Sequence, residues 1–378
     1  MTFPDTWRSL RVALSHDWLT GMRGGERVLE ILCDGFPDAA IHTLIHNPAA
    51  VSARIARHPI HTSWLQSVPG VQENYRRMLP LFPFALHAMP APDADLIIST
   101  SHCVAKALQA KPGASHLCYC FTPMRYAWTF HDEYLGRNPL KRLAARPLLA
   151  ALRMWDRHTA PRVTRFVAIS RHVRDRIERF YGRGADVVYP PVDTARCTPG
   201  PADASGYDLI VSALVPYKRV DLAVNAYRRS GHPLKIVGVG GEFRRLQAIA
   251  APNIELLGWQ TDEAILGLYR GCRMLVFPGE EDFGIVPLEA QSCGKPVVAF
   301  ARGGALETVV AGQTGIFFDT QTPEALQDAV TACAHTAWDA VAIRKHAERF
   351  GVQTFIDGMA RAVTACLNND PIFFQPNT

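Results

Sequence analysis

Three features that would define whole classes of protein are absent from this 378-residue sequence. No apolar run approaches the roughly 18 residues that a membrane-spanning helix needs, and the first ten residues hold no apolar segment of the secretory kind. The nine cysteines form no pair of C-x-x-C motifs, so the sequence encodes neither a structural zinc site nor a disulfide framework. We therefore expect a cytoplasmic protein with free thiols.

A strong excess of charge is also missing, since 40 Lys and Arg against 35 Asp and Glu leave a net charge of +5, which argues against a nucleic-acid partner. The positive charge is concentrated in residues 137–183, which contain 13 Lys or Arg and three Asp or Glu. Four arginines of this stretch share one face at helical spacing: Arg142, Arg146, Arg153 and Arg157. They predict either a solvated helix face or peripheral docking to the anionic inner face of the plasma membrane.

Metal-binding patterns are equally scarce. Asp93 and Asp95 form a D-x-D string of the kind that some metal-dependent transferases use, but they directly precede a predicted strand. Aspartates in that place are ordinary turn residues. We expect no metal and no cofactor.

What the sequence does contain is a regular alternation of short apolar runs with longer amphipathic stretches, in two series. This pattern is typical of parallel sheets covered by crossover helices, and it predicts an α/β protein of two Rossmann-like domains. A stretch rich in proline and glycine, residues 198–206, indicates the linker. We expect an N-terminal domain over residues 1–195, a C-terminal domain over 206–350, and a final helix and tail over 351–378 that can cross back to the first domain.

The most informative segment joins a predicted strand through a loop to a predicted helix, and it carries Glu281 and Glu289 with seven residues between them. The amides of Gly284, Ile285 and Val286 open the helix and suit a diphosphate group. Both carboxylates can accept hydrogen bonds from sugar hydroxyls. The plainer alternative is an acidic surface loop and a surface helix residue, and the combined spacing favours the binding site.

This segment, with Phe283 and Gly284 inside it, resembles the E-x7-E signature of glycosyltransferase family 4. Further similarities lie in the glycine loop of residues 16–29, the segment 215–221 and the loop 303–307. The resemblance implies the GT-B architecture, in which two Rossmann-like domains face each other across a cleft. Within the family, the chain is most similar to bacterial mannosyltransferases that assemble O-antigen and other surface polysaccharides.

The resemblance also implies an activity. A retaining, metal-independent hexosyltransferase would move a sugar from a GDP- or UDP-linked donor, with GDP-mannose as the best guess, to a lipid-linked or oligosaccharide acceptor in surface-polysaccharide or lipopolysaccharide biosynthesis. Glu281 would hold the donor sugar and Glu289 the nucleotide. Lys218, Arg219 and the amides of Gly24, Gly25 and the loop at Phe283 would stabilise the leaving diphosphate.

Two positions depart from the family pattern. Ala213 stands where relatives often carry an arginine, and Arg219 is the expected substitute for its charge. Phe121 stands where relatives commonly carry a histidine that contacts the sugar. The candidates to replace that histidine, or to bind acceptor or sugar beside it, are His16, His102, His131, Arg125 and Tyr126.

These departures leave two alternatives open. One is another GT-B enzyme, such as a sugar-nucleotide epimerase or hydrolase, which would need no acceptor. The other is a non-catalytic GT-B partner in a polysaccharide assembly complex, which would bind the donor without turnover.

Overall fold

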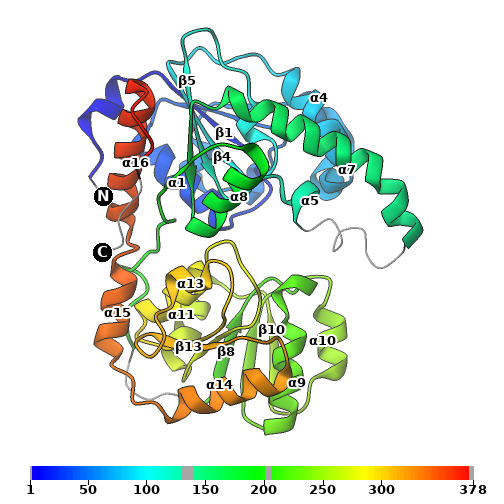
Figure 1. The fold of residues 1–378 in the computed structure, drawn as a ribbon, viewed down its shortest axis with the longest axis vertical. Helices are drawn as coiled ribbons and strands as arrows, with labels where there is room; N and C mark the ends of the chain where they lie inside the picture. The colour runs from blue at the N-terminus through cyan, green and yellow to red at the C-terminus, as the bar shows by residue number, and fades with distance from the viewer. Residues whose placement is uncertain (1, 130–138, 201–205, 374–378) are drawn as a thin grey trace. The chain divides into compact units, whose positions relative to one another are not determined.

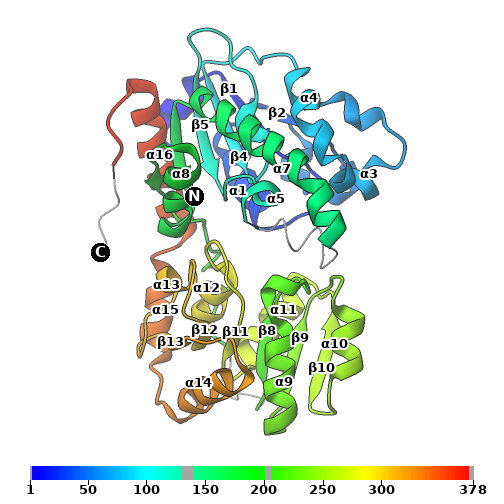
Figure 2. The same ribbon diagram turned by 45° about the vertical axis from the view of Figure 1, so that its right-hand side comes forward.

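The computed structural model describes residues 2–129, 139–200 and 206–373. The chain divides into two compact units. The N-terminal unit comprises Met1–Tyr189 together with Phe355–Thr378, and the C-terminal unit comprises Pro190–Thr354. In each unit, helices cover a parallel sheet on both faces (Figures 1 and 2).

The N-terminal unit contains a seven-stranded sheet of order β3-β2-β1-β4-β5-β6-β7, in which every pairing is parallel. The strands are β1 (Val12–His16), β2 (Ala40–Thr43), β3 (Ile60–Thr62), β4 (Leu96–Ser101), β5 (Ser115–Cys120), β6 (Arg165–Ala168) and β7 (Asp186–Val187). All six residues of β4 are buried, as expected of a central strand covered on both faces.

The helices of this unit follow the strands in the usual crossover pattern. They are α1 (Gly24–Gly35), α2 (Ala53–Ala56), α3 (Val71–Asn74), α4 (Phe82–His87), α5 (Arg125–Trp128), α7 (Pro139–Thr159) and α8 (Arg171–Tyr181), with α16 (Val352–Asn368) joining the unit from Phe355 onward. Helix α1 buries Val28, Leu29 and Leu32, whose spacing places them on one face of the helix against the sheet.

The C-terminal unit contains a six-stranded sheet of order β10-β9-β8-β11-β12-β13, again parallel throughout. The strands are β8 (Asp208–Val211), β9 (Leu234–Val237), β10 (Ile254–Gly258), β11 (Leu275–Phe277), β12 (Val297–Phe300) and β13 (Gly315–Phe318). The helices are α9 (Val220–Ser230), α10 (Phe243–Ile249), α11 (Asp262–Gly271), α12 (Ile285–Ser292), α13 (Ala305–Thr308), α14 (Pro323–His335) and α15 (Ala340–Glu348).

Paired buried charges connect the elements of each unit. In the C-terminal unit the carboxylate of Asp208, fully buried at the start of β8, accepts hydrogen bonds from the hydroxyl of Tyr227 at 2.7 Å and from the guanidinium of Arg273 at 2.9 Å. In the N-terminal unit the buried pair Arg165–Asp186 ties β6 to β7, and Arg165 also donates to the carbonyl of Asp370 after α16. Buried charges persist in proteins when they are paired in this way.

The predicted fold class, an α/β protein built from two Rossmann-like domains, is confirmed by this architecture. The sequence did not predict β3, a three-residue strand at the edge of the N-terminal sheet. Edge strands of that length carry too few residues to give a clear apolar pattern.

Candidate functional site

Each sheet has one point where the strand order reverses. In the C-terminal unit it lies between β8 and β11, and in the N-terminal unit between β1 and β4. Open α/β sheets bind their ligands outside the carboxyl ends of the strands at such a point. Lys218 and Glu281 follow β8 and β11, whereas Gly24 and His102 follow β1 and β4. The predicted site residues therefore occupy the switch point of each sheet.

In the C-terminal unit, the ammonium of Lys218 forms an ion pair with the carboxylate of Glu281. The two side chains are only 15% and 21% exposed, and the Lys218 Nζ lies 5.1 Å from the centre of the Tyr217 ring. The pair is held between two loops that approach closely, because a Cβ at Gly279 would lie 2.8 Å from the Cα of Lys218 and 2.9 Å from the carbonyl oxygen of Tyr217. Only glycine fits there, so Gly279 positions the pair. The sequence alone did not point to Gly279, because the requirement comes from Tyr217 and Lys218, which are distant in the chain.

Arg219 adopts a left-handed backbone conformation, with φ of 51°, between the short turn that ends at Lys218 and helix α9. Its guanidinium donates to the side-chain oxygen of Gln321 at 3.0 Å and lies 3.3 Å from Asp221. Gln321 in turn donates to the carbonyl of Pro278. Arg219 is thus linked to the loop that carries Glu281, although part of its charge is already balanced by Asp221.

The loop that the sequence analysis assigned to a diphosphate leads into the start of α12. Gly284, at φ of 109°, precedes the helix, and Ile285 and Val286 form its first turn. Phe283 is 3% exposed, so its side chain supports the loop from inside. The amide of Gly304 donates to the carbonyl of Glu281 at 2.8 Å and fixes the loop from the other side.

Glu289, one turn further along α12, is held by two residues that the sequence analysis did not identify. The hydroxyl of Tyr269 donates to one carboxylate oxygen at 2.8 Å, and Arg196 approaches the other at 3.9 Å. Burial, and then the nearby charge of Glu289, raise the pKa of Tyr269 well above its ordinary value, so the phenol keeps its proton and acts as a donor. The carboxylate of Glu289 is therefore presented in a fixed orientation.

In the N-terminal unit, Gly24 and Gly25 open helix α1, whose first turn is capped by a hydrogen bond from the amide of Arg23 to the carboxylate of Glu26. A Cβ at Gly25 would lie 3.2 Å from the ring of Phe121 and 3.5 Å from that of His16. The phenyl ring of Phe121 therefore packs directly against the glycine turn.

His16 is almost fully buried beneath this turn. Its Nδ1 lies 2.7 Å from the hydroxyl of Thr100, and its Nε2 lies 3.9 Å from Glu26. Burial acts to raise the pKa of Glu26, but the hydrogen bond and charge of His16 outweigh it, so that the pKa is lowered. One ring nitrogen of His16 thus contacts Thr100, the other faces Glu26, and the ring is almost inaccessible to solvent.

His102 has a different environment. Its Nδ1 lies 2.9 Å from the carboxylate of Asp17, which is fully buried. That carboxylate also accepts hydrogen bonds from the backbone amides of four consecutive residues, between 2.6 and 3.0 Å: His102, Cys103, Val104 and Ala105. Burial acts to raise the pKa of Asp17, yet the charge interaction with His102 and the side-chain and backbone hydrogen bonds of that residue lower it to about 2. Asp17 therefore remains ionised.

Aromatic rings connect His102 to the predicted acceptor residues. The ring of Trp18 meets His102 edge-on at 4.6 Å between centroids and lies 6.3 Å from the ring of Tyr126. The amide of Arg125 donates to the carbonyl of His102 at 3.5 Å. The structure thus brings His102, Arg125 and Tyr126 together, whereas His131 lies outside the described residues.

The four predicted membrane-docking arginines do not behave alike. Arg146 and Arg157 are exposed on α7, but Arg153 turns inward, where it donates to the carbonyl of Ala127 at 2.7 Å and lies over the ring of Trp128. The side chain of Arg142 lies outside the described part of the chain. Leu143 and Met154 on the same helix are 58% and 69% exposed, so apolar side chains accompany the exposed arginines.

No group of three or more His, Cys, Asp or Glu that could hold a metal ion occurs among the residues that the structure describes. Asp93 and Asp95 instead pair with Arg11, at 3.2 and 2.6 Å. Likewise, within the described ranges, no helix has both the length and the apolar character that a membrane crossing demands.

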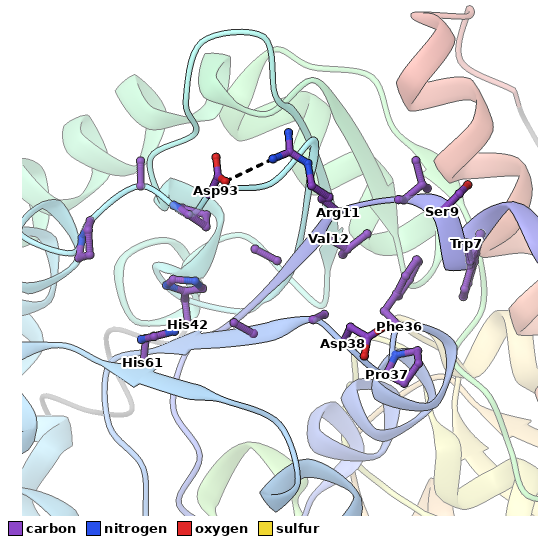
Figure 3. Close-up of a pocket in the computed structure, with 17 residues that line it drawn as sticks. Trp7, Ser9, Arg11, Val12, Phe36, Pro37, Asp38, His42, His61 and Asp93 are labelled. Atoms are coloured by element: carbon purple, nitrogen blue, oxygen red, sulfur yellow. Dashed lines mark hydrogen bonds and ion pairs between the residues drawn. The ribbon is translucent and has the colours of Figure 1, made fainter.

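One cavity of about 580 Å³ opens at the amino ends of β1 and β2, and Figure 3 shows its lining. The stacked rings of His42 and His61 lie on one side, Trp7 and Phe36 lie on the other, and Arg11 stands at the rim. None of the predicted site residues contributes to its lining.

Comparison with known proteins agrees with the fold. Residues 22–196 match the family model for Glycosyltransferase Family 4, and residues 201–350 match the model for Glycosyl transferases group 1. Together the two models cover most of the chain. The N-terminal half is therefore similar to family 4 glycosyltransferases, and the C-terminal half is similar to the glycosyl transferases of group 1.

Curated relatives include the D-inositol 3-phosphate glycosyltransferase of Rhodococcus opacus, 29% identical over an alignment of 249 residues that covers 56% of this chain and 56% of the relative. An uncharacterized glycosyltransferase of Methanocaldococcus jannaschii is 28% identical over 171 residues, 44% of this chain and 48% of the relative. The chain thus spans about half the length of the curated relatives it matches.

Solved structures match over nearly the whole chain at low identity. Sucrose-phosphate synthase of Thermosynechococcus elongatus superposes with a TM-score of 0.73 at 18% identity, over 95% of this chain and 100% of that one. HepE of Anabaena, solved with UDP-glucose, gives 0.67 at 19% identity, over 94% and 100%. These similarities establish the GT-B fold.

Proposed function

We propose that this protein transfers a sugar from a nucleoside diphosphate donor to a saccharide acceptor with retention at the anomeric carbon. The observation that carries the proposal is the ion pair of Lys218 with Glu281 at the switch point of the C-terminal sheet, with Glu289 presented nearby on α12. A cation, a helix N-terminus and two carboxylates are the groups that a sugar diphosphate requires.

The ion pair of Lys218 with Glu281 can be exchanged for contacts with the donor. When the donor binds, its diphosphate competes with Glu281 for the ammonium of Lys218, because the diphosphate as a whole carries more negative charge than a single carboxylate. Released from Lys218, the carboxylate of Glu281 can accept hydrogen bonds from hydroxyls of the donor sugar. One event thus places a cation on the leaving group and an acceptor on the sugar.

The chemical step depends on charge. As the bond from the sugar to the diphosphate breaks, negative charge grows on the leaving phosphate and is met by Lys218, by Arg219 and by the amides at the start of α12. Preorganised groups of this kind lower the barrier because they need not reorient during the reaction. Glu289, fixed by Tyr269, is assigned to the nucleotide ribose.

The donor is proposed as a GDP- or UDP-linked hexose. GDP-mannose is supported by the resemblance to mannosyltransferases of surface-polysaccharide assembly, whereas HepE of Anabaena, which shares the fold, was solved with UDP-glucose. Another structural neighbour is a galactosyltransferase of the lipopolysaccharide outer core. A lipid-linked or oligosaccharide acceptor in surface-polysaccharide synthesis follows from the same resemblance.

A peripheral membrane location is part of the proposal. Arg146 and Arg157 on α7 stand beside exposed Leu143 and Met154, a combination suited to an anionic bilayer surface. Each arginine near such a surface would contribute about 1 kcal/mol. Docking there would bring the N-terminal unit close to a lipid-linked acceptor.

The test is a thermal-shift screen of GDP-, UDP-, ADP- and TDP-sugars, followed by transfer assays with the stabilising donor. A ligand at 100 times its Kd should stabilise the fold by about 2.7 kcal/mol. Release of nucleoside diphosphate that depends on an acceptor supports the transferase. Acceptor-independent release would favour a hydrolase or epimerase, and tight binding without turnover would favour a non-catalytic partner.

A further inference from the structure

We propose that His102, held by the buried carboxylate of Asp17, supplies through its Nε2 the hydroxyl contact that Phe121 cannot make. This inference rests on the proposed sugar transfer. His102 would bind a hydroxyl of the donor sugar or the acceptor, and Asp17 would act as a positioning residue.

The geometry of Asp17 fixes which ring nitrogen carries the proton. An ionised carboxylate has no hydrogen to donate, so the Nδ1 of His102, 2.9 Å away, must be the donor. In the neutral ring the other nitrogen, Nε2, then holds a lone pair and accepts hydrogen bonds. Asp17 therefore selects the tautomer whose acceptor is Nε2, the ring nitrogen that does not contact Asp17.

The residues that the structure describes form no hydrogen bond to this acceptor, the Nε2 of His102, and the side chain is 26% exposed. By contrast, the ring of His16 is 2% exposed, with Thr100 and Glu26 at its two nitrogens. Of these two candidates, only His102 has a nitrogen to offer to a substrate.

Strand register brings His102 to the place that Phe121 leaves without a polar group. Ser101 pairs with Cys120 at the ends of β4 and β5, so the next residues, His102 and Phe121, lie side by side at the carboxyl edge. Their ring centroids are 6.5 Å apart. Phe121 packs on the turn at Gly25. The polar side chain beside it at this edge is that of His102, which follows the neighbouring strand β4.

The ring of His102 is held rigidly enough to give a specific contact. The carboxylate of Asp17 contacts both the Nδ1 and the backbone amide of His102. Trp18 meets the imidazole ring at an interplanar angle of 84°. A preoriented acceptor loses little entropy when a hydroxyl binds.

The first experiment is an imidazole ¹⁵N NMR spectrum of the protein, with the His102 signals assigned from a His102→Asn variant. We expect the neutral ring to carry its proton on Nδ1, and its Nε2 signal to move when a saturating GDP- or UDP-hexose is added. A proton on Nε2, or signals that stay unchanged with bound donor and with acceptor, would overturn the inference whether or not transfer is detected.

The second experiment is kinetic. In His102→Asn the side-chain amide can still donate to Asp17, because the amide nitrogen of asparagine takes the place of Nδ1, but the outward acceptor is lost. We expect kcat/KM to fall about tenfold to a hundredfold, as for the loss of one substrate hydrogen bond, with an unchanged melting temperature. His335→Asn, which replaces an exposed histidine at the end of α14, is the matched control and should keep wild-type activity.

The outcomes separate the two proposals. If wild type transfers sugar and His102→Asn keeps its kcat/KM within twofold, the role of His102 is refuted and the proposed function stands. If wild type transfers nothing while the NMR signals respond to the donor, the proposed function fails and the contact remains. A loss in His102→Asn that appears equally in His335→Asn would refute a specific contact.

Discussion

Replacing Lys218 with methionine should remove the cation that the proposed mechanism places on the leaving phosphate while keeping an unbranched side chain that is one atom shorter. Loss of one preorganised group that stabilises developing charge typically lowers kcat by about 10²–10³. The reaction itself provides the assay, as acceptor-dependent release of nucleoside diphosphate under saturating donor.

The same substitution should have only a moderate effect on stability. Exposed ion pairs contribute about 0–1 kcal/mol, whereas removing one partner of a fully buried pair costs about 3–5 kcal/mol. With side chains 15% and 21% exposed, the pair of Lys218 with Glu281 lies between these limits, and we expect a loss of about 1–2 kcal/mol after allowing for solvent screening. Urea unfolding of Lys218→Met, Glu281→Gln and the double variant measures this coupling.

The reasoning would be refuted by a Lys218→Met variant that folds and keeps kcat within threefold of wild type. The control is Arg229→Met, which removes a cation from the surface of the C-terminal unit. Arg229 is 63% exposed in a surface ion pair with Glu324, and its replacement should change neither kcat nor stability measurably.

Three further predictions follow from single contacts. Tyr269→Phe removes the hydrogen bond to Glu289 and should raise the donor KM several-fold with little change in kcat, measured by steady-state kinetics; an unchanged KM would contradict the role of Tyr269. Gly279→Ala places a Cβ 2.8 Å from the Cα of Lys218, so we expect a lower melting temperature and weaker donor binding. A variant as stable and as active as wild type would be inconsistent with the close approach of the two loops. Burial lowers the pKa of His42 to about 4 and that of His116 to about 3, so on acidification these histidines take up protons in the unfolded chain before they do in the folded protein. The free energy of unfolding should therefore fall as the pH drops from about 6.5 toward 4. Urea unfolding at pH 7 and pH 5 measures this fall, which should be smaller in His42→Phe.

The parts of the fold that depend on local pattern could be predicted from the sequence. The alternation of apolar strands and amphipathic helices predicts two parallel sheets. The strand orders confirm this prediction. The segment from Glu281 to Glu289 could also be recognised, because its spacing and its glycine lie in one continuous stretch of chain. These features need no knowledge of tertiary contacts.

The parts of the site that depend on tertiary contacts could not be predicted. Gly279 is required by the backbone of Lys218, and Tyr269 reaches Glu289 from a different helix. In the sequence, Asp17 is simply a polar residue after a strand. Its role depends on four backbone amides from a distant loop that donate to its carboxylate. Helical spacing grouped Arg153 with the other arginines of α7, although its partner is the carbonyl of Ala127.

The central claim is tested most directly by one measurement, in which ¹H NMR follows the reaction of the purified protein with its stabilising sugar nucleotide and a saccharide acceptor. The account predicts a new glycosidic bond with the anomeric configuration of the donor, formed in step with nucleoside diphosphate and lost in Lys218→Met. An inverted product, free sugar in place of a glycoside, or a Lys218→Met variant that forms the bond at the wild-type rate would contradict it.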